Sequence, residues 1–278
     1  MKIRSILLLL LLCHTGFALP IGNPAEPSLL TESFVCSLFD ECVSVRAGFY
    51  GDYVFNRYLE VDDSFNRVVD VTKINTNAGY LALNYCNWLD LFATVGASNV
   101  WIQTPSTAFR ERGLAAGELF TITTNTSFSW SVGVRAALIE CACFTLGVEG
   151  QYFQTCLPLN YVKEEADLPI YVGGSTMQYQ EGQVGIALSR TFYAPSPCIA
   201  FIPYIGLKAA WASVDMNNLR VVVDNIQTDT YVLHDLQSTK RWGYAVGITT
   251  ALNKVISISA ERRFGDENGL YVNGQIRF

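Results

Sequence analysis

The closing stretch Leu270-Tyr271-Val272-Asn273-Gly274-Gln275-Ile276-Arg277-Phe278 alternates between two kinds of residue. Apolar or small residues occupy the even positions, whereas tyrosine, polar and charged residues occupy the odd positions. Successive side chains of a β-strand point to opposite faces of the sheet, so this stretch predicts a strand with one apolar and one polar face.

The same two-residue period recurs toward the N-terminus, in segments long enough for a tilted strand to cross a bilayer. A hairpin within 219–233 would add two strands, so we expect about 12 strands within a range of about 10 to 16. The individual segments that show the pattern are 43–57, 73–86, 89–102, 127–139, 143–156, 177–192, 199–212, 240–251, 254–264 and 269–278.

The connections between these segments also alternate. Four are long (58–72, 103–126, 157–176 and 213–239) and those between them are short, as in outer-membrane barrels with long outer loops. A soluble antiparallel sandwich is the alternative, but its strands are usually shorter and its core could not bury so polar an inner face. The sequence therefore predicts an all-β, antiparallel, up-and-down transmembrane β-barrel of the outer membrane. The aromatic Phe278 on its outward face is the expected signal for insertion by the barrel-assembly machinery.

The amino-acid composition and the N-terminal residues of the chain are those expected of an exported membrane protein. Hydrophobic residues make up 50% and charged residues 16%, against about 25% charged in an ordinary soluble domain. Lys2 and Arg4 precede an apolar run and Ala18 is a small residue after it, which predicts a signal peptide at 1–18. A periplasmic N-terminal segment would follow at 19–42, and the barrel at 43–278. The net charge of -6 argues against a nucleic-acid partner.

Catalytic signatures are missing from the sequence. Cleavage after Ala18 would leave one histidine, His234, in a long loop, and the chain has no G-x-S-x-G, P-loop or dinucleotide-binding motif. Cys141-x-Cys143 lacks the second ligand pair that zinc requires. We therefore expect no enzyme activity, no catalytic residue, no metal and no cofactor.

Function is then expected to depend on the barrel lumen. If six basic residues face three acidic ones there, a water-filled pore should pass small hydrophilic solutes with a mild preference for anions and carboxylates. Two alternatives remain: the charges pair across the lumen, or the barrel is narrow or closed with a structural or adhesive role. The inward positions are Arg46, Tyr50, Asp52, Arg135, Glu149, Lys208, Arg241, Glu261, Arg263, Asn273, Gln275 and Arg277.

Several blocks resemble the chlamydial major outer membrane protein family, in family order and across nearly the whole exported chain. The blocks are LPIGNPAEPSL at 19–29, RAGFYGDYVF at 46–55, FSWSVGVRAALIECAC at 128–143, PYIGLK at 203–208 and VNGQIRF at 272–278. The resemblance implies a porin that is also a disulfide-linked element of the cell envelope. The chain is much shorter than the dominant porin, chiefly in the long loops, so it resembles a compact paralogue.

Seven cysteines would remain after cleavage, so at least one would be unpaired or bonded to another chain. Cys156 is expected toward the outside, and Cys86 and Cys156 could simply fill strand ends. Small solutes or ions, outer-membrane lipid, cross-linked envelope proteins and further copies of this chain, for example in a trimer, are the expected partners. Six cysteines are expected at the periplasmic rim, where the periplasm permits disulfides and the resemblance implies cross-links: Cys36, Cys42, Cys86, Cys141, Cys143 and Cys198.

Overall fold

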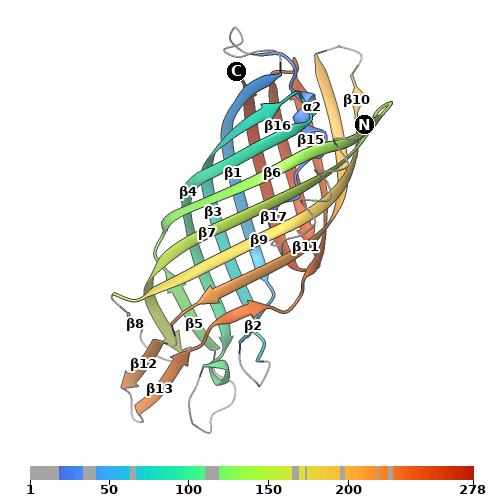
Figure 1. Ribbon diagram of the computed structural model, residues 1–278. Helices are drawn as coiled ribbons and strands as arrows, with labels where there is room; N and C mark the ends of the chain where they lie inside the picture. The colour runs from blue at the N-terminus through green and yellow to red at the C-terminus, as the bar shows by residue number, and fades with distance from the viewer. Residues whose placement is uncertain are drawn as a thin grey trace.

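A closed ring of ten antiparallel strands forms the protein in the computed structural model, which describes residues 19–33, 42–62, 67–109, 119–164, 169–172, 174–194, 198–217, 219–224 and 228–278 (Figure 1). Each wall strand pairs with the next, and the last pairs with the first. The wall strands are β1 (Val43–Arg57), β3 (Val71–Tyr85), β4 (Leu89–Pro105), β6 (Ser127–Cys141), β7 (Phe144–Glu164), β9 (Thr176–Arg190), β11 (Ile199–Asp215), β15 (Trp242–Leu252), β16 (Ile256–Phe264) and β17 (Glu267–Arg277).

All ten predicted segments are strands of this wall, which confirms the predicted fold class. The favoured count of about 12 is corrected to ten wall strands. The extra hairpin exists as β12 (Leu219–Asp224) and β13 (Thr228–Leu233), but within the described residues these two strands pair with each other and not with the wall.

Shorter strands extend the barrel at its two ends. At the end with the long connections lie β2 (Leu59–Val61), β5 (Leu119–Thr124), β8 (Ile170–Tyr171), β14 (Leu236–Ser238) and the 3-10 helix η1 (Ser106–Ala108). At the opposite end, which also carries the C-terminus and the short helix α2 (Glu26–Leu29), β10 (Phe192–Tyr193) pairs with β11 (Figure 1). In the described part of the chain, no helix combines the length and the apolar character needed to traverse a membrane.

The outward face of the wall is apolar and exposed. On β3, Leu81 and Leu83 are about half exposed, whereas Tyr80 and Ala82, which alternate with them, are buried inside. Aromatic side chains such as Trp242 and Phe128 are exposed on the same outer surface. An exposed apolar band with aromatic residues is what a barrel presents to lipid. The two-residue period of the sequence therefore reflects one strand face toward the exterior and the other toward the lumen.

On one side of the barrel, neutral hydroxyl groups line the inner face. Thr76 of β3 and Ser98 of β4 share a hydrogen bond of 2.7 Å, and Thr94 of β4 and Ser131 of β6 share one of 2.6 Å. Gln151 of β7 donates to the Ser131 hydroxyl at 2.8 Å. These hydroxyl groups bind one another across the wall, which compensates for their burial.

The N-terminal segment differs from its expected position. We assigned 19–42 to a periplasmic segment preceding the barrel, but residues 19–33 run inside the barrel, where Leu19, Ile21 and Leu30 are each at most 3% exposed. The reason is the polar interior: polar wall groups there bind the backbone and the Glu26 side chain of this segment. Residues 34–41, including Cys36, lie outside the described residues.

Candidate functional site

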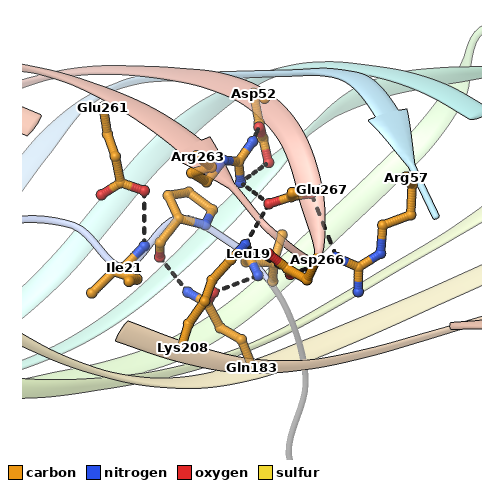
Figure 2. A network of polar contacts seen from close by, with 12 residues as sticks. Leu19, Ile21, Asp52, Arg57, Gln183, Lys208, Glu261, Arg263, Asp266 and Glu267 are labelled. Atoms are coloured by element: carbon orange, nitrogen blue, oxygen red, sulfur yellow. Dashed lines mark hydrogen bonds and ion pairs between the residues drawn. The ribbon is translucent and has the colours of Figure 1, made fainter. Parts of the chain in front are cut away.

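Ionised side chains from five strands and from the turn before β17 meet in the lumen (Figure 2). Lys208 of β11 lies 3.2 Å from Asp266 and also pairs with Glu267. Arg263 of β16 pairs with Asp52 of β1 and, at 3.2 Å, with Glu267. In the low-dielectric interior such pairs are much stronger than on a surface, but each depends on its partners staying in place.

Arg57 joins this cluster from the end of β1. Its guanidinium lies 2.7 Å from Asp266, 3.3 Å from Glu181 of β9 and 3.7 Å from Glu267. Arg57 is fully buried, so an unpaired charge at this position would be costly. The cluster therefore joins strands from opposite parts of the sequence across the barrel. We call Asp52, Arg57, Glu181, Lys208, Arg263, Asp266 and Glu267 the lumen charge cluster.

A second group of charges lies nearer the end that carries α2. Arg135 of β6 pairs with Glu149 of β7, its cross-strand neighbour, and also with Glu26 of α2. Arg46 of β1 lies 2.9 Å from Asp90 of β4 and donates to the backbone oxygen of Glu26 at 2.8 Å. The wall therefore offers fixed positive charge to the N-terminal segment at two strands.

The backbone of the N-terminal segment is also bound by the wall. Glu261 of β16 accepts the N–H groups of Ile21 at 3.1 Å and of Gly22 at 2.9 Å. The Gln183 amide of β9 accepts the N–H of Leu19 at 2.6 Å and donates to the Pro20 oxygen (Figure 2). These contacts satisfy backbone groups that have no strand partner.

Gly22 lies close against the Arg135 side chain of the wall. Its φ is +65°, and a Cβ on it would overlap the Arg135 guanidinium. Only glycine adopts this backbone conformation at no cost while leaving that space empty. The position of Arg135 between the segment and β7 therefore depends on glycine at this position.

The structure places most of the predicted pore-lining residues inside the barrel, but Arg241 is a correction. Arg241 is exposed and lies just before β15, which begins at Trp242, so it is not among the buried residues of the lumen. The residues buried inside are Arg46, Tyr50, Asp52, Arg135, Glu149, Lys208, Glu261, Arg263, Asn273, Gln275 and Arg277.

Sequence reasoning missed several charged groups of the lumen. Asp90 and Glu181 lie on the inward face of their strands, so the same two-residue period could have identified them. Glu26 and Asp266 lie outside any strand and carry no such signal. With these residues, the buried charges within the described chain become six basic and eight acidic: Arg46, Arg57, Arg135, Lys208, Arg263 and Arg277 against Glu26, Asp52, Asp90, Glu149, Glu181, Glu261, Asp266 and Glu267. Among the described residues, the lumen therefore carries no basic excess.

The described cysteines gather mainly at the end with the short turns. Cys42 precedes β1, and its backbone oxygen accepts the N–H of Cys86 at 2.5 Å. Cys141 and Cys143 flank the turn between β6 and β7, Cys198 precedes β11 and Cys156 is exposed farther along β7. Cys141 and Cys198 are also exposed and, like Cys86, Cys143 and Cys156, carry no disulfide within the described chain.

Phe278 lies at the seam that closes the ring. Its backbone N–H donates to the oxygen of Val45 on β1 at 2.8 Å, so the last residue is tied to the first wall strand. Within the described residues, no group of three or more His, Cys, Asp or Glu side chains has the geometry to hold a metal ion. The arrangement can orient charge and hold a peptide segment.

A family model and two similar proteins point to the same family. The model of a family described as Chlamydia major outer membrane protein matches residues 1–74 and 62–171. A major outer membrane porin of Chlamydia pneumoniae is 30% identical over 94% of this chain and 94% of its own length, and one of Chlamydia psittaci is 30% identical over 94% and 95%.

Solved structures with a similar arrangement are distant in sequence. The beta domain of the Bordetella autotransporter Brka covers 85% of this chain and 100% of its own, with 12% identity and a TM-score of 0.44. The Ralstonia pickettii toluene transporter TbuX covers 95% of this chain and 94% of its own, with 10% identity and a TM-score of 0.34.

Proposed function

The chain belongs to the Chlamydia major outer membrane protein family, and from this premise we propose that it is an outer-membrane porin through whose lumen small hydrophilic solutes diffuse passively. The observation that carries the proposal is the closed ten-stranded ring with an apolar exterior and buried charged residues in its interior. Relatives named as major outer membrane porins support the same role and the outer-membrane location, and they point to a protein that is not an enzyme.

Selectivity should be weak. The mild preference for anions and carboxylates that the sequence suggested depends on an excess of basic groups, whereas the buried inventory has six basic and eight acidic residues. Most of these charges are paired within 4 Å, so their fields largely cancel along the lumen. We therefore propose a pore that discriminates by size and favours cations slightly.

Planar-bilayer recording of the purified protein tests both statements. We expect stepwise ion conductance and, in a salt gradient, a small zero-current potential of the sign given by cation preference. The potential should shrink above about 0.1 to 0.15 M salt, where the Debye length falls to about 8–10 Å. A folded barrel that never conducts would contradict the porin, and a strong anion preference would contradict the charge balance. The same sample unfolded by heat is the control.

A second candidate function is a closed barrel with a structural or adhesive role. The observation that favours it is the occupied lumen, since residues 19–33 fill the interior and the wall charges around them are at most 7% exposed on their side chains. The recording described above separates the two candidates, because a permanently closed barrel gives no conductance steps.

Cross-linking through the rim cysteines is the other part of the proposal. We propose that Cys141 and its neighbours at the short-turn end form disulfides with other envelope proteins or with further copies of this chain. Two observations support this: Cys141 and Cys198 are exposed at that end, and an outer-membrane barrel opens there into the periplasm, which permits disulfides.

Non-reducing electrophoresis of native envelopes should therefore show oligomers that collapse on reduction. The Cys141→Ser, Cys143→Ser double variant should lose most of them, because it removes both thiols of one rim turn. Cys156→Ser is the matched control, since Cys156 is exposed but lies farther along β7. A monomer band that reductant leaves unchanged would disprove the cross-linking.

A further inference from the structure

The N-terminal segment of residues 19–33 touches the wall on all sides of the lumen. Ile21 packs against Ala187 of β9 and Ala245 of β15, and a Cβ on Gly206 of β11 would lie 2.9 Å from the Ile21 side chain. On other strands the segment is bound by Arg46 of β1, Asn84 of β3, Arg135 of β6 and Gln275 of β17. A segment held from so many strands spans the cross-section of the barrel.

We propose that residues 19–33 are a releasable plug, held in the lumen by Glu26, and that the pore conducts only while this plug is displaced. The inference rests on the proposed porin function and adds its regulation. The plug belongs to the chain itself, so opening requires no partner, only loss of the contacts that hold Glu26 and its neighbours.

Glu26 is the main polar anchor of the plug. Its carboxylate pairs with Arg135, and it accepts hydrogen bonds from Ser259 of β16 at 2.8 Å and from Gln275 of β17 at 3.1 Å. Glu26 is 1% exposed, so these three wall groups replace its water. The Glu26 carboxylate would be the uncompensated charge if Arg135 were lost, so this ion pair holds the segment in the closed state.

The wall keeps its own structure when the plug leaves. Residues 19–23 and 30–33 form no strand, and the segment contacts the wall mainly through wall side chains rather than through a backbone ladder. Arg135 retains Glu149, and Arg46 retains Asp90. Displacement therefore leaves both arginines paired, which favours a reversible opening.

The direction of release follows from the fold. Helix α2 lies at the end with the short turns, where residue 42 leads into β1, so the plug is tethered at that end (Figure 1). By the outer-membrane rule this end faces the periplasm. The plug would therefore withdraw toward the periplasm.

Charge reversal of the anchor tests the proposal in the full-length, purified protein. In planar bilayers, Glu26→Lys should raise the open fraction roughly tenfold or more over the unmodified chain, because it sets a cation against Arg135 and Arg46 and breaks a buried ion pair. Glu32→Lys is the matched control: it makes the same charge change in the same segment at an exposed position, and should leave the open fraction unchanged. Gly22→Ala should also favour opening, through steric overlap with Arg135 and no change in charge.

The outcomes separate the two proposals. If Glu26→Lys and Gly22→Ala conduct as the unmodified chain does, the plug is not a gate and the porin stands. If none of the proteins conducts although heat-modifiable electrophoretic migration shows folded barrels, the porin function fails and the gate with it. If Glu32→Lys opens the pore as much as Glu26→Lys, net charge rather than the anchor controls opening, and the proposal is wrong.

Discussion

Lys208→Glu should prevent the barrel from forming stably. The ammonium of Lys208 is 1% exposed and pairs with Asp266 at 3.2 Å and with Glu267. After the substitution, the lumen charge cluster would hold two basic groups against five acidic ones. Breaking one buried pair costs about 3–5 kcal/mol, and reversing the charge adds repulsion to that loss. This is a large share of the roughly 5–15 kcal/mol by which an ordinary domain is stable.

Heat- and urea-dependent migration of the refolded protein in electrophoresis would measure this loss. Lys254→Glu is the matched control, since it reverses the same charge at an exposed position in the turn before β16. We expect the control to unfold at the denaturant concentration of the unmodified chain. Equal stability of Lys208→Glu and the control would mean that the lumen charge cluster is hydrated instead of buried.

Gly48→Ala should weaken the closure of the ring. Gly48 lies on β1 opposite Gln275 of β17, at the seam that joins the first and last wall strands. A Cβ on Gly48 would overlap the backbone oxygen of Gly274. No rotamer change relieves a clash with backbone, so the two strands must move apart, at a cost of about 1–3 kcal/mol or more.

Gly79→Ala on the neighbouring strand β3 is the control for this seam. A Cβ on Gly79 would meet its nearest atom, the backbone oxygen of Val95, at 3.8 Å, which is an ordinary contact. Urea unfolding of the two variants should show a lower midpoint for Gly48→Ala and little change for Gly79→Ala. Equal midpoints would show that the seam has room for a methyl group.

The wall of the barrel could be predicted from the sequence alone. The period of two is a local property, because the polypeptide itself points successive side chains to opposite faces. Positions such as Leu81 and Ile258 therefore face outward, while Asn273 and Arg135 face inward, whatever strand lies beside them. The connection lengths identified the two ends in the same way, since short hairpins need only a few residues.

The tertiary structure alone decided which charges meet inside. The register of β1 against β17 shifts between Val54 and Asn56, so this irregularity turns Arg57 inward although simple alternation from Arg46 would place it outside. Arg241 shows the opposite case. The sequence pattern includes it in a strand, but β15 begins at Trp242, one residue after it. Such shifts depend on the partner strand, which a single strand sequence does not specify.

The placement of residues 19–33 is the clearest case of a tertiary effect. Nothing in LPIGNPAEPSL has a period, and its proline and glycine residues predict only an irregular segment. The wall supplies Arg46, Arg135 and Glu261 from strands far apart in the sequence, and only the closed ring brings them around one space. Local alternation therefore determines the barrel wall, whereas the contents of the lumen depend on charges that meet only after the ring has closed, because each must find a partner away from water.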